Sequence, residues 1–137
     1  MNTNIKISTN KEINGLKVAF ATNDMQNIDA HFGSCQKFAV YDVSKDDNQM
    51  SGIIHTKEEK DKDGDKTANI INALKGIDIV YFLDIGPIAA AKVINNKIFP
   101  IKYKEVVSIE QEVNKLSSML GSNPPPFIKK IVSAKGM

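Results

Sequence analysis

The stretch IDAHFGSCQKF places His31 and Cys35, the only cysteine of the chain, four residues apart with Gly33 between them. Imidazole and thiolate are soft ligands, and together they suit iron, zinc or iron–sulfur species better than calcium or magnesium. Two ligands do not fill a tetrahedral structural site, but they could hold a preassembled cluster that lacks a terminal ligand. An alternative stays open, in which Cys35 is a small buried hydrophobe and His31 hydrogen-bonds within its loop.

The sequence DIGPIAAAK, residues 84–92, is a second candidate because it predicts a turn followed directly by a helix. The first N–H groups of a helix favour an anion, and Gly86 would let a ligand approach the backbone closely. The segment matches neither the G-x-G-x-x-G nor the Walker pattern, and a purely structural role is the commoner one for such a turn. His55, the other histidine, is expected at the surface.

The sequence contains no arrangement of residues typical of an enzyme. No serine is set in a nucleophile elbow, and the first predicted strand carries no carboxylate that could hold a metal pair. His31 and Cys35 lack a third group that would orient the imidazole. For a metal-dependent hydrolase, the strand ends offer only Asp84 with Asp24 or Asp42. We therefore expect a protein that is not an enzyme.

The composition is that of one globular domain in a reducing compartment. The chain has 137 residues, and its 42% hydrophobic content is enough for a single packed core. A lone cysteine cannot form an internal disulfide, and no apolar run approaches the ~20 residues that span a bilayer. A net charge of +2 is too small to indicate nucleic-acid binding. We expect a cytoplasmic protein that binds neither nucleic acid nor membranes.

Hydrophobic patterning predicts strands and helices after a polar, flexible lead-in over residues 1–14. The expected single domain covers residues 15–132, and residues 133–137 form a tail. The predicted strands are 16–22, a hairpin of 37–44 and 50–57, then 77–84 and 98–103. The predicted helices are 66–76, 88–96 and 108–120, the last with a capping box at Ser108 and Gln111, and a proline-led element follows.

This order, with an antiparallel hairpin first and βα units afterwards, predicts an α/β fold with a mixed sheet flanked by helices. In such sheets, ligands bind in the crevice beyond the carboxyl ends of the parallel strands. The loop after Thr22, which carries His31 and Cys35, and the DIGP turn should meet at that crevice. Thr22 and Asn23 are therefore expected to give hydrogen bonds to a ligand.

Three motifs, HFGSC at 31–35, IGPIAAAKVINNKIFPIK at 85–102 and MLGSNPPPFIKK at 119–130, resemble the NifX family of nitrogenase iron-molybdenum cofactor biosynthesis proteins. The resemblance runs from about Leu16 to Val132, and the superfamily includes NifY and the C-terminal domain of NifB. It implies a ribonuclease-H-like three-layer fold, with a mixed five-stranded sheet flanked by helices, and no nuclease chemistry.

The resemblance also implies a non-enzymatic carrier. Such proteins bind the iron–sulfur precursor called NifB cofactor, or the iron-molybdenum cofactor, and pass it between NifB, the NifEN scaffold and apo-dinitrogenase. The expected ligand is the histidine of the family's H-F-G motif, here His31, with Cys35 as a second metal ligand. The rest of the expected cofactor-binding set is Thr22, Asn23, Phe32, Gly33 and Gly86.

Two other functions stay open. The chain could be a protein-binding chaperone for apo-dinitrogenase or the scaffold, in which case His31 would be secondary. It could also be a superfamily member that acts outside nitrogen fixation.

Overall fold

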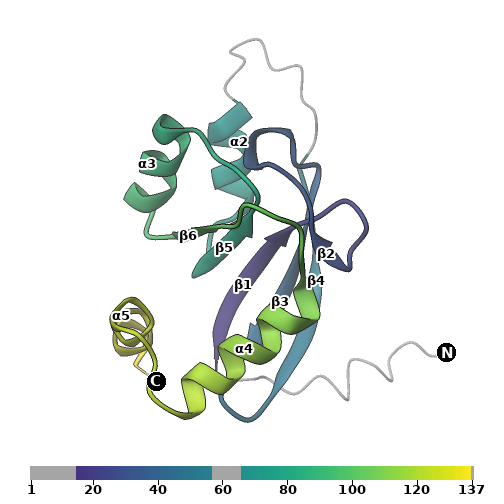
Figure 1. Cartoon of the computed structure of the whole chain (residues 1–137). Coiled ribbons are helices and arrows are strands. Elements are labelled where there is room, and N and C mark those ends of the chain that lie inside the picture. Colours follow the sequence, from purple (N-terminus) through teal and green to yellow (C-terminus); the bar gives the residue numbers. More distant parts are fainter. Residues whose placement is uncertain (1–14, 57–65, 137) are drawn as a thin grey trace, which may run out of the picture.

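The computed structural model describes residues 15–56 and 66–136, whose elements form three layers (Figure 1). The central sheet has five strands in the order β4-β3-β1-β5-β6. Helices α2 and α3 cover one face of this sheet, and α4 and α5 cover the other. The predicted α/β architecture with a mixed five-stranded sheet is confirmed. The predicted lead-in over residues 1–14 lies outside the described residues.

Three neighbouring strands of the sheet are parallel and end at the same edge. β1 pairs with β5 and β5 with β6 in parallel, whereas β3 is antiparallel to β1 and to β4. The turn between β3 and β4 is tighter than predicted, because the Ser44 N–H donates to the Asp47 carbonyl at 2.7 Å. The bounds are β1 Leu16–Ala21, β3 Lys37–Val43, β4 Asn48–His55, β5 Ile79–Phe82 and β6 Phe99–Lys102.

The helices lie close to their predicted positions and are α2 Lys66–Ala73, α3 Pro87–Asn95, α4 Ile109–Gly121 and α5 Pro126–Lys135. The predicted cap of α4 is present, since the Ser108 side chain accepts a hydrogen bond from the Gln111 N–H at 3.3 Å. Helix α5 continues to Lys135, so part of the predicted tail is helical. Within the two described ranges, no helix is long and apolar enough to cross a membrane.

Alternation along the strands builds two cores, one on each face of the sheet. In β1, Ala19 and Ala21 face α2 and α3, whereas Val18 and Phe20 face α4 and α5. The Phe20 ring stacks on Tyr81 with ring centroids 4.6 Å apart. Since both faces of the sheet are covered, the central parallel strand β5 has no charged residue and is buried along its whole length, as expected for a buried parallel strand.

Three short elements were not predicted from the sequence: β2 Asn27–Ile28, the 3₁₀ helix η1 Phe32–Ser34, and β7 Val107–Ser108. Elements of two or three residues are too short to show a periodic pattern. β2 and β7 pair with each other in antiparallel orientation, and the Ile109 N–H donates to the Gln26 carbonyl at 3.0 Å. These contacts tie the loop after β1 to the start of α4.

Candidate functional site

The loop between β1 and η1 is organised by hydrogen bonds to two aspartates. Asp24 accepts bonds of 2.8 Å from the backbone N–H groups of Gln26 and Asn27 and from the Asn27 side chain. These bonds, that from Gln26 foremost, lower the pKa of Asp24 from 3.8 to about 2. Asp29 accepts a bond of 2.6 Å from the backbone N–H of Asn23. The loop therefore leaves β1 along a path fixed by its own side chains.

His31 lies at the carboxyl edge of the parallel strands, immediately before η1. Its side chain is 61% exposed, and Nδ1 lies 3.9 Å from Oδ2 of Asp84 in the turn after β5. The Phe32 N–H donates to the Asp84 carbonyl at 2.8 Å, and the Leu83 N–H donates to the Ala30 carbonyl at 3.0 Å. These two backbone bonds confirm that the loop after β1 and the DIGP turn meet.

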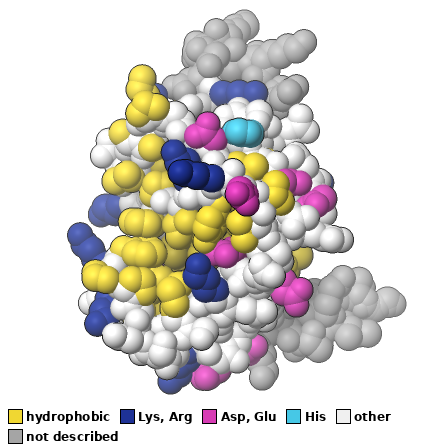
Figure 2. Space-filling model, viewed as in Figure 1, with side chains coloured by type: hydrophobic (Ala, Val, Ile, Leu, Met, Phe, Trp, Pro, Cys, Tyr) yellow, Lys and Arg dark blue, Asp and Glu magenta, His cyan; other side chains and the backbone are white. Residues whose placement is uncertain are grey.

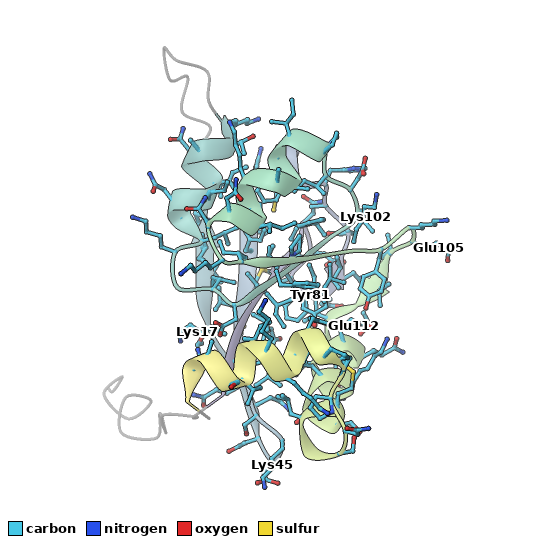
Figure 3. The ribbon with its side chains drawn as sticks, turned by 90° about the vertical axis from the view of Figure 1, so that its left-hand side faces the viewer. Lys17, Lys45, Tyr81, Lys102, Glu105 and Glu112 are labelled. Carbon is cyan, nitrogen blue, oxygen red and sulfur yellow. The ribbon has the colours of Figure 1, made fainter. Side chains whose placement is uncertain are left out.

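Lys102 brings a third exposed side chain to this edge, from the end of β6 (Figure 3). Its Nζ lies 4.0 Å from Oδ1 of Asp84. β1, β5 and β6 are neighbours in the sheet. His31 lies in the long connection after β1, Asp84 follows β5, and Lys102 ends β6. The sequence suggested Asp84 only as a hydrolase carboxylate, and Lys102 was not predicted. The signal that could have found Lys102 is its place as the last polar residue of a predicted parallel strand.

Cys35 lies in the core, in contrast to the exposed His31. It is 3% exposed, and its thiol donates a hydrogen bond of 2.8 Å to the Lys37 carbonyl. Burial raises the pKa of the Cys35 thiol from 9.0 to about 11, so the thiol is protonated at neutral pH. The structure therefore does not present a thiolate and an imidazole on one surface, contrary to the arrangement that we expected for a shared metal site.

Thr22 and Phe32 are also buried, although we expected both to face a ligand. Thr22 Oγ1 donates to Asp24 at 3.3 Å and accepts from the Met25 N–H at 2.9 Å, so the hydroxyl is used within the loop. The Phe32 ring packs edge-on against Phe82, with centroids 5.6 Å apart. Both side chains thus support the loop from inside the protein.

Asn23, Gly33 and Gly86 are exposed, like His31. The Asn23 side chain donates a bond of 3.1 Å to the Asp29 carbonyl. A Cβ atom added at Gly33 or Gly86 would meet no atom within 4 Å, so the space beside both backbones is open. Gly86 precedes the first residue of α3, where backbone N–H groups attract negative charge. Of the predicted site residues, these four reach the surface.

The described residues contain no group of three or more His, Cys, Asp or Glu side chains that could hold a metal ion. At this edge of the sheet, the only soft ligand that is exposed among the predicted residues is the imidazole of His31. A bare metal ion ordinarily needs a fuller set of protein ligands. A metal-containing ligand at this site would therefore have to bring most of its own coordination.

Comparison with known proteins identifies the family. The family described as dinitrogenase iron-molybdenum cofactor matches residues 14–119. The chain is 36% identical over 123 residues to NifX of Rhodobacter capsulatus, which covers 85% of this chain and 77% of that protein. It is 33% identical over 129 residues to NifX of Sinorhizobium fredii, and this match covers 89% of this chain and 81% of that protein. The chain belongs to the NifX family.

The fold of this NifX-family chain has a solved counterpart in a protein from Methanocaldococcus jannaschii. The two chains superpose with a TM-score of 0.57, over 82% of this chain and 100% of that one, at 14% sequence identity. At this level of identity the likeness concerns the fold alone. It shows that the arrangement of the sheet and its covering helices recurs outside the relatives with similar sequences.

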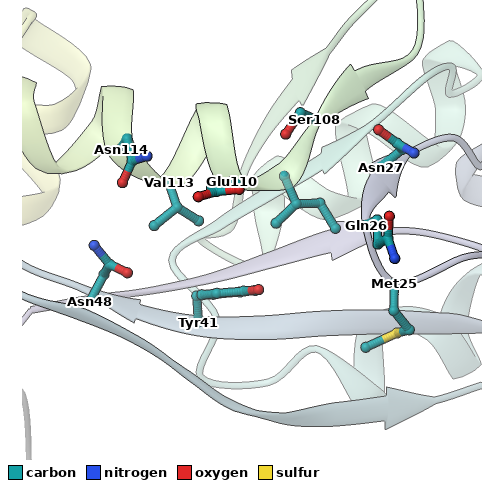
Figure 4. A pocket seen from close by; sticks show the side chains of 10 residues that line it. Met25, Gln26, Asn27, Tyr41, Asn48, Ser108, Glu110, Val113 and Asn114 are labelled. Atoms are coloured by element: carbon teal, nitrogen blue, oxygen red, sulfur yellow. The ribbon is translucent and has the colours of Figure 1, made fainter.

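The NifX-family chain also has a groove of about 400 Å³ between β3, α4 and the loop after β1 (Figure 4). Its lining is rich in amide side chains and contains no histidine or cysteine: Met25, Gln26, Asn27, Tyr41, Asn48, Ser108, Ile109, Glu110, Val113 and Asn114. None of the predicted site residues lines this groove. The candidate site for a metal-containing ligand is therefore the edge that carries His31.

Proposed function

We propose that this chain is a non-enzymatic carrier that binds and transfers an iron–sulfur precursor (NifB cofactor) or the iron-molybdenum cofactor during nitrogenase cofactor assembly. The observation that carries the proposal is the exposed imidazole of His31 at the edge of the sheet, beside Asp84, whose other carboxylate oxygen lies 4.0 Å from Lys102. Membership of a family described by the iron-molybdenum cofactor supports the same role. The cluster is then the cargo of the protein.

In this proposal, His31 binds one iron of the cargo through Nε2, because Nδ1 faces Asp84. A carboxylate beside the second ring nitrogen is the common arrangement for metal-binding histidines, since it orients the ring and raises its basicity. The separation of 3.9 Å exceeds a hydrogen bond, so loading would draw the two side chains closer. Lys102 and the first N–H groups of α3 would attract the negative charge of the cluster.

A carrier must release what it binds, and the site supports weak holding. One imidazole is a small part of a coordination sphere, and the edge is open to solvent at Gly33 and Gly86. Cys35 remains a core residue in this proposal, because its buried, protonated thiol would need the loop to open before it could reach a cluster. If protein side chains filled the whole coordination sphere of the cluster, release of the cargo would be slower.

The wider setting follows from the same proposal. NifB is the expected donor of the cargo, the NifEN scaffold is the expected acceptor, and apo-dinitrogenase is a further partner, all in the cytoplasm.

We also assign the sheet order β4-β3-β1-β5-β6 to a ribonuclease-H-like fold, because its first strands are antiparallel and parallel βα units follow them.

The experiment is an anaerobic titration of the protein with isolated NifB cofactor, followed by visible absorption and gel filtration. We expect brown colour to co-elute with the wild type and to be lost with His31→Ala. His55→Ala is the matched control, because His55 is the other exposed histidine and lies at the end of β4. Cys35→Ala should keep the colour if its thiol stays in the core.

Equal colour in all variants would move the site away from His31. No colour in any of them would reject the carrier function and favour a protein-binding chaperone or a role outside nitrogen fixation. Loss of colour with His55→Ala as well as His31→Ala would point to nonspecific binding through surface imidazoles.

A further inference from the structure

Helix α3 is apolar on its outer side as well as on the side that faces the sheet. Val93 is buried, yet Ile88 is 74% exposed and Ile94 is 57% exposed. A surface helix ordinarily keeps its apolar residues on one face, and a helix that is apolar all round is ordinarily buried. The outer side of α3 thus exposes large apolar side chains next to Lys92 and Asn95, a mixture that is typical of a surface that binds another molecule.

The apolar surface continues beyond α3 onto the edge of the sheet. β6 is an edge strand, and its Phe99 is 37% exposed and stacks on Phe127 of α5 with centroids 4.3 Å apart. Figure 2 shows hydrophobic side chains gathered on the left of the molecule, and Figure 3 looks directly onto that side, with α3 above β6 and α5 below it. We call this surface the α3–β6 face and define it by Ile88, Ile94, Phe99 and Phe127.

All the charged residues that the α3–β6 region contributes are basic. Residues 85–104, which contain α3 and β6, have four lysines and no acidic residue, and α5 has three lysines and no acidic residue. Two copies of such a face would repel each other, whereas an acidic surface would attract it. Lys135 pairs with Asp78 at 2.8 Å and Lys102 lies 4.0 Å from Asp84, so these two lysines are partly neutralised. The seven lysines are Lys92, Lys97, Lys102, Lys104, Lys129, Lys130 and Lys135.

We propose that the α3–β6 face docks a partner protein whose contact surface combines an apolar centre with an acidic rim. This proposal rests on the proposed carrier function, because the partner would be the acceptor of the cargo. Helix α3 begins at Pro87, directly after the turn that holds Asp84 beside His31. Docking on α3 would therefore bring the partner against the edge where the cargo is held, so that transfer needs no long diffusion.

The test compares variants on the two edges of the sheet for binding to the NifEN scaffold, the acceptor in the proposed function, by biolayer interferometry. Ile88→Asp with Ile94→Asp places charge on the face. The matched control is Met50→Asp with Ile53→Asp on β4, where the side chains are 44% and 45% exposed at the opposite edge. We expect Kd to rise about tenfold or more for the α3 pair and less than about threefold for the control.

Charge is tested separately, because Lys129→Glu with Lys130→Glu should also weaken binding, and the wild-type affinity should fall as salt is added. Equal affinity of the α3 pair, the control pair and the wild type would overturn the docking surface. So would a wild type that holds the cluster but does not bind the scaffold. Thermal unfolding of each variant by circular dichroism verifies that it is folded.

Two further measurements exclude other occupants. Light scattering that shows self-association of the wild type, abolished by Ile88→Asp with Ile94→Asp, would assign the face to a second copy and overturn the proposal. Sedimentation with phosphatidylserine–phosphatidylcholine vesicles, abolished by the same pair, would assign it to lipid with the same consequence. The cluster titration separates the two proposals. The Lys129→Glu with Lys130→Glu pair, on α5 and away from the first turn of α3, should still turn brown. A wild type that takes up no cluster refutes the carrier function and leaves scaffold binding measurable on the empty protein.

Discussion

The state of the Cys35 thiol decides whether the site has one soft ligand or two, and its reactivity can be predicted from the structure. Burial raises the pKa of this thiol from 9.0 to about 11. At pH about 8, an ordinary thiol with a pKa of 9.0 is roughly one-tenth thiolate, whereas Cys35 should be roughly one-thousandth thiolate. Because the thiolate is the reacting species, alkylation of the folded protein should be at least about 100-fold slower than that of the unfolded chain.

The assay is alkylation by iodoacetamide at pH about 8, followed by intact-protein mass spectrometry. The rate in buffer is compared with the rate in guanidinium chloride, where the thiol is exposed. Since Cys35 is the only cysteine, each added mass reports on this one side chain. The core position and the bond to the Lys37 carbonyl slow the reaction further, because the reagent must reach a residue that is 3% exposed.

A rate in buffer within a few-fold of the unfolded rate would refute this reasoning. It would mean that the η1 segment opens readily and that a thiolate is within reach of a cluster. The cargo provides a second check, because a single-ligand site predicts the same slow alkylation with and without bound cluster. Additional protection of Cys35 on loading would instead show that the thiol joins His31 as a ligand.

Three further predictions concern stability and the open glycines. Burial makes the Cys35 thiolate unfavourable in the folded state, so no stability is lost below pH 9 and about 3 kcal/mol is lost as the pH rises towards about 11. Burial raises the pKa of Tyr103 as well, so urea midpoints should fall through this range and fall less in Cys35→Ala. Phe32→Ala should lower the free energy of unfolding by about 3–5 kcal/mol in urea titrations, because its ring is buried against Phe82. Gly15→Ala should lower the free energy of unfolding by about 1–3 kcal/mol, because the added Cβ would lie 2.2 Å from the Val43 oxygen. Gly33→Ala should change this free energy by less than about 0.5 kcal/mol, because the space beside Gly33 is open, but should weaken uptake of NifB cofactor. Unchanged uptake would show that the cargo does not lie against the Gly33 backbone.

Local sequence patterns predicted most of the fold. Each of the predicted helices and main-sheet strands is present, and the Ser108 cap marks the start of α4 as its sequence indicates. These features depend on neighbours within a few residues, which is why periodicity and capping residues reveal them. The short elements β2, β7 and η1 depend instead on pairing between distant segments, such as the bond from Ile109 to Gln26, and so had no local signal.

Residue types alone predicted the segment from His31 to Cys35 as the candidate for soft-metal chemistry, and the order of strands and helices predicted that this segment meets the DIGP turn. Which side chains face outward was decided by tertiary packing. The sheet and its covering helices buried Cys35, and parallel strand ends brought Asp84 beside both His31 and Lys102. Spacing along a loop does not specify burial, because desolvation depends on what packs over each side chain, and that is settled only when all layers of the fold are in place.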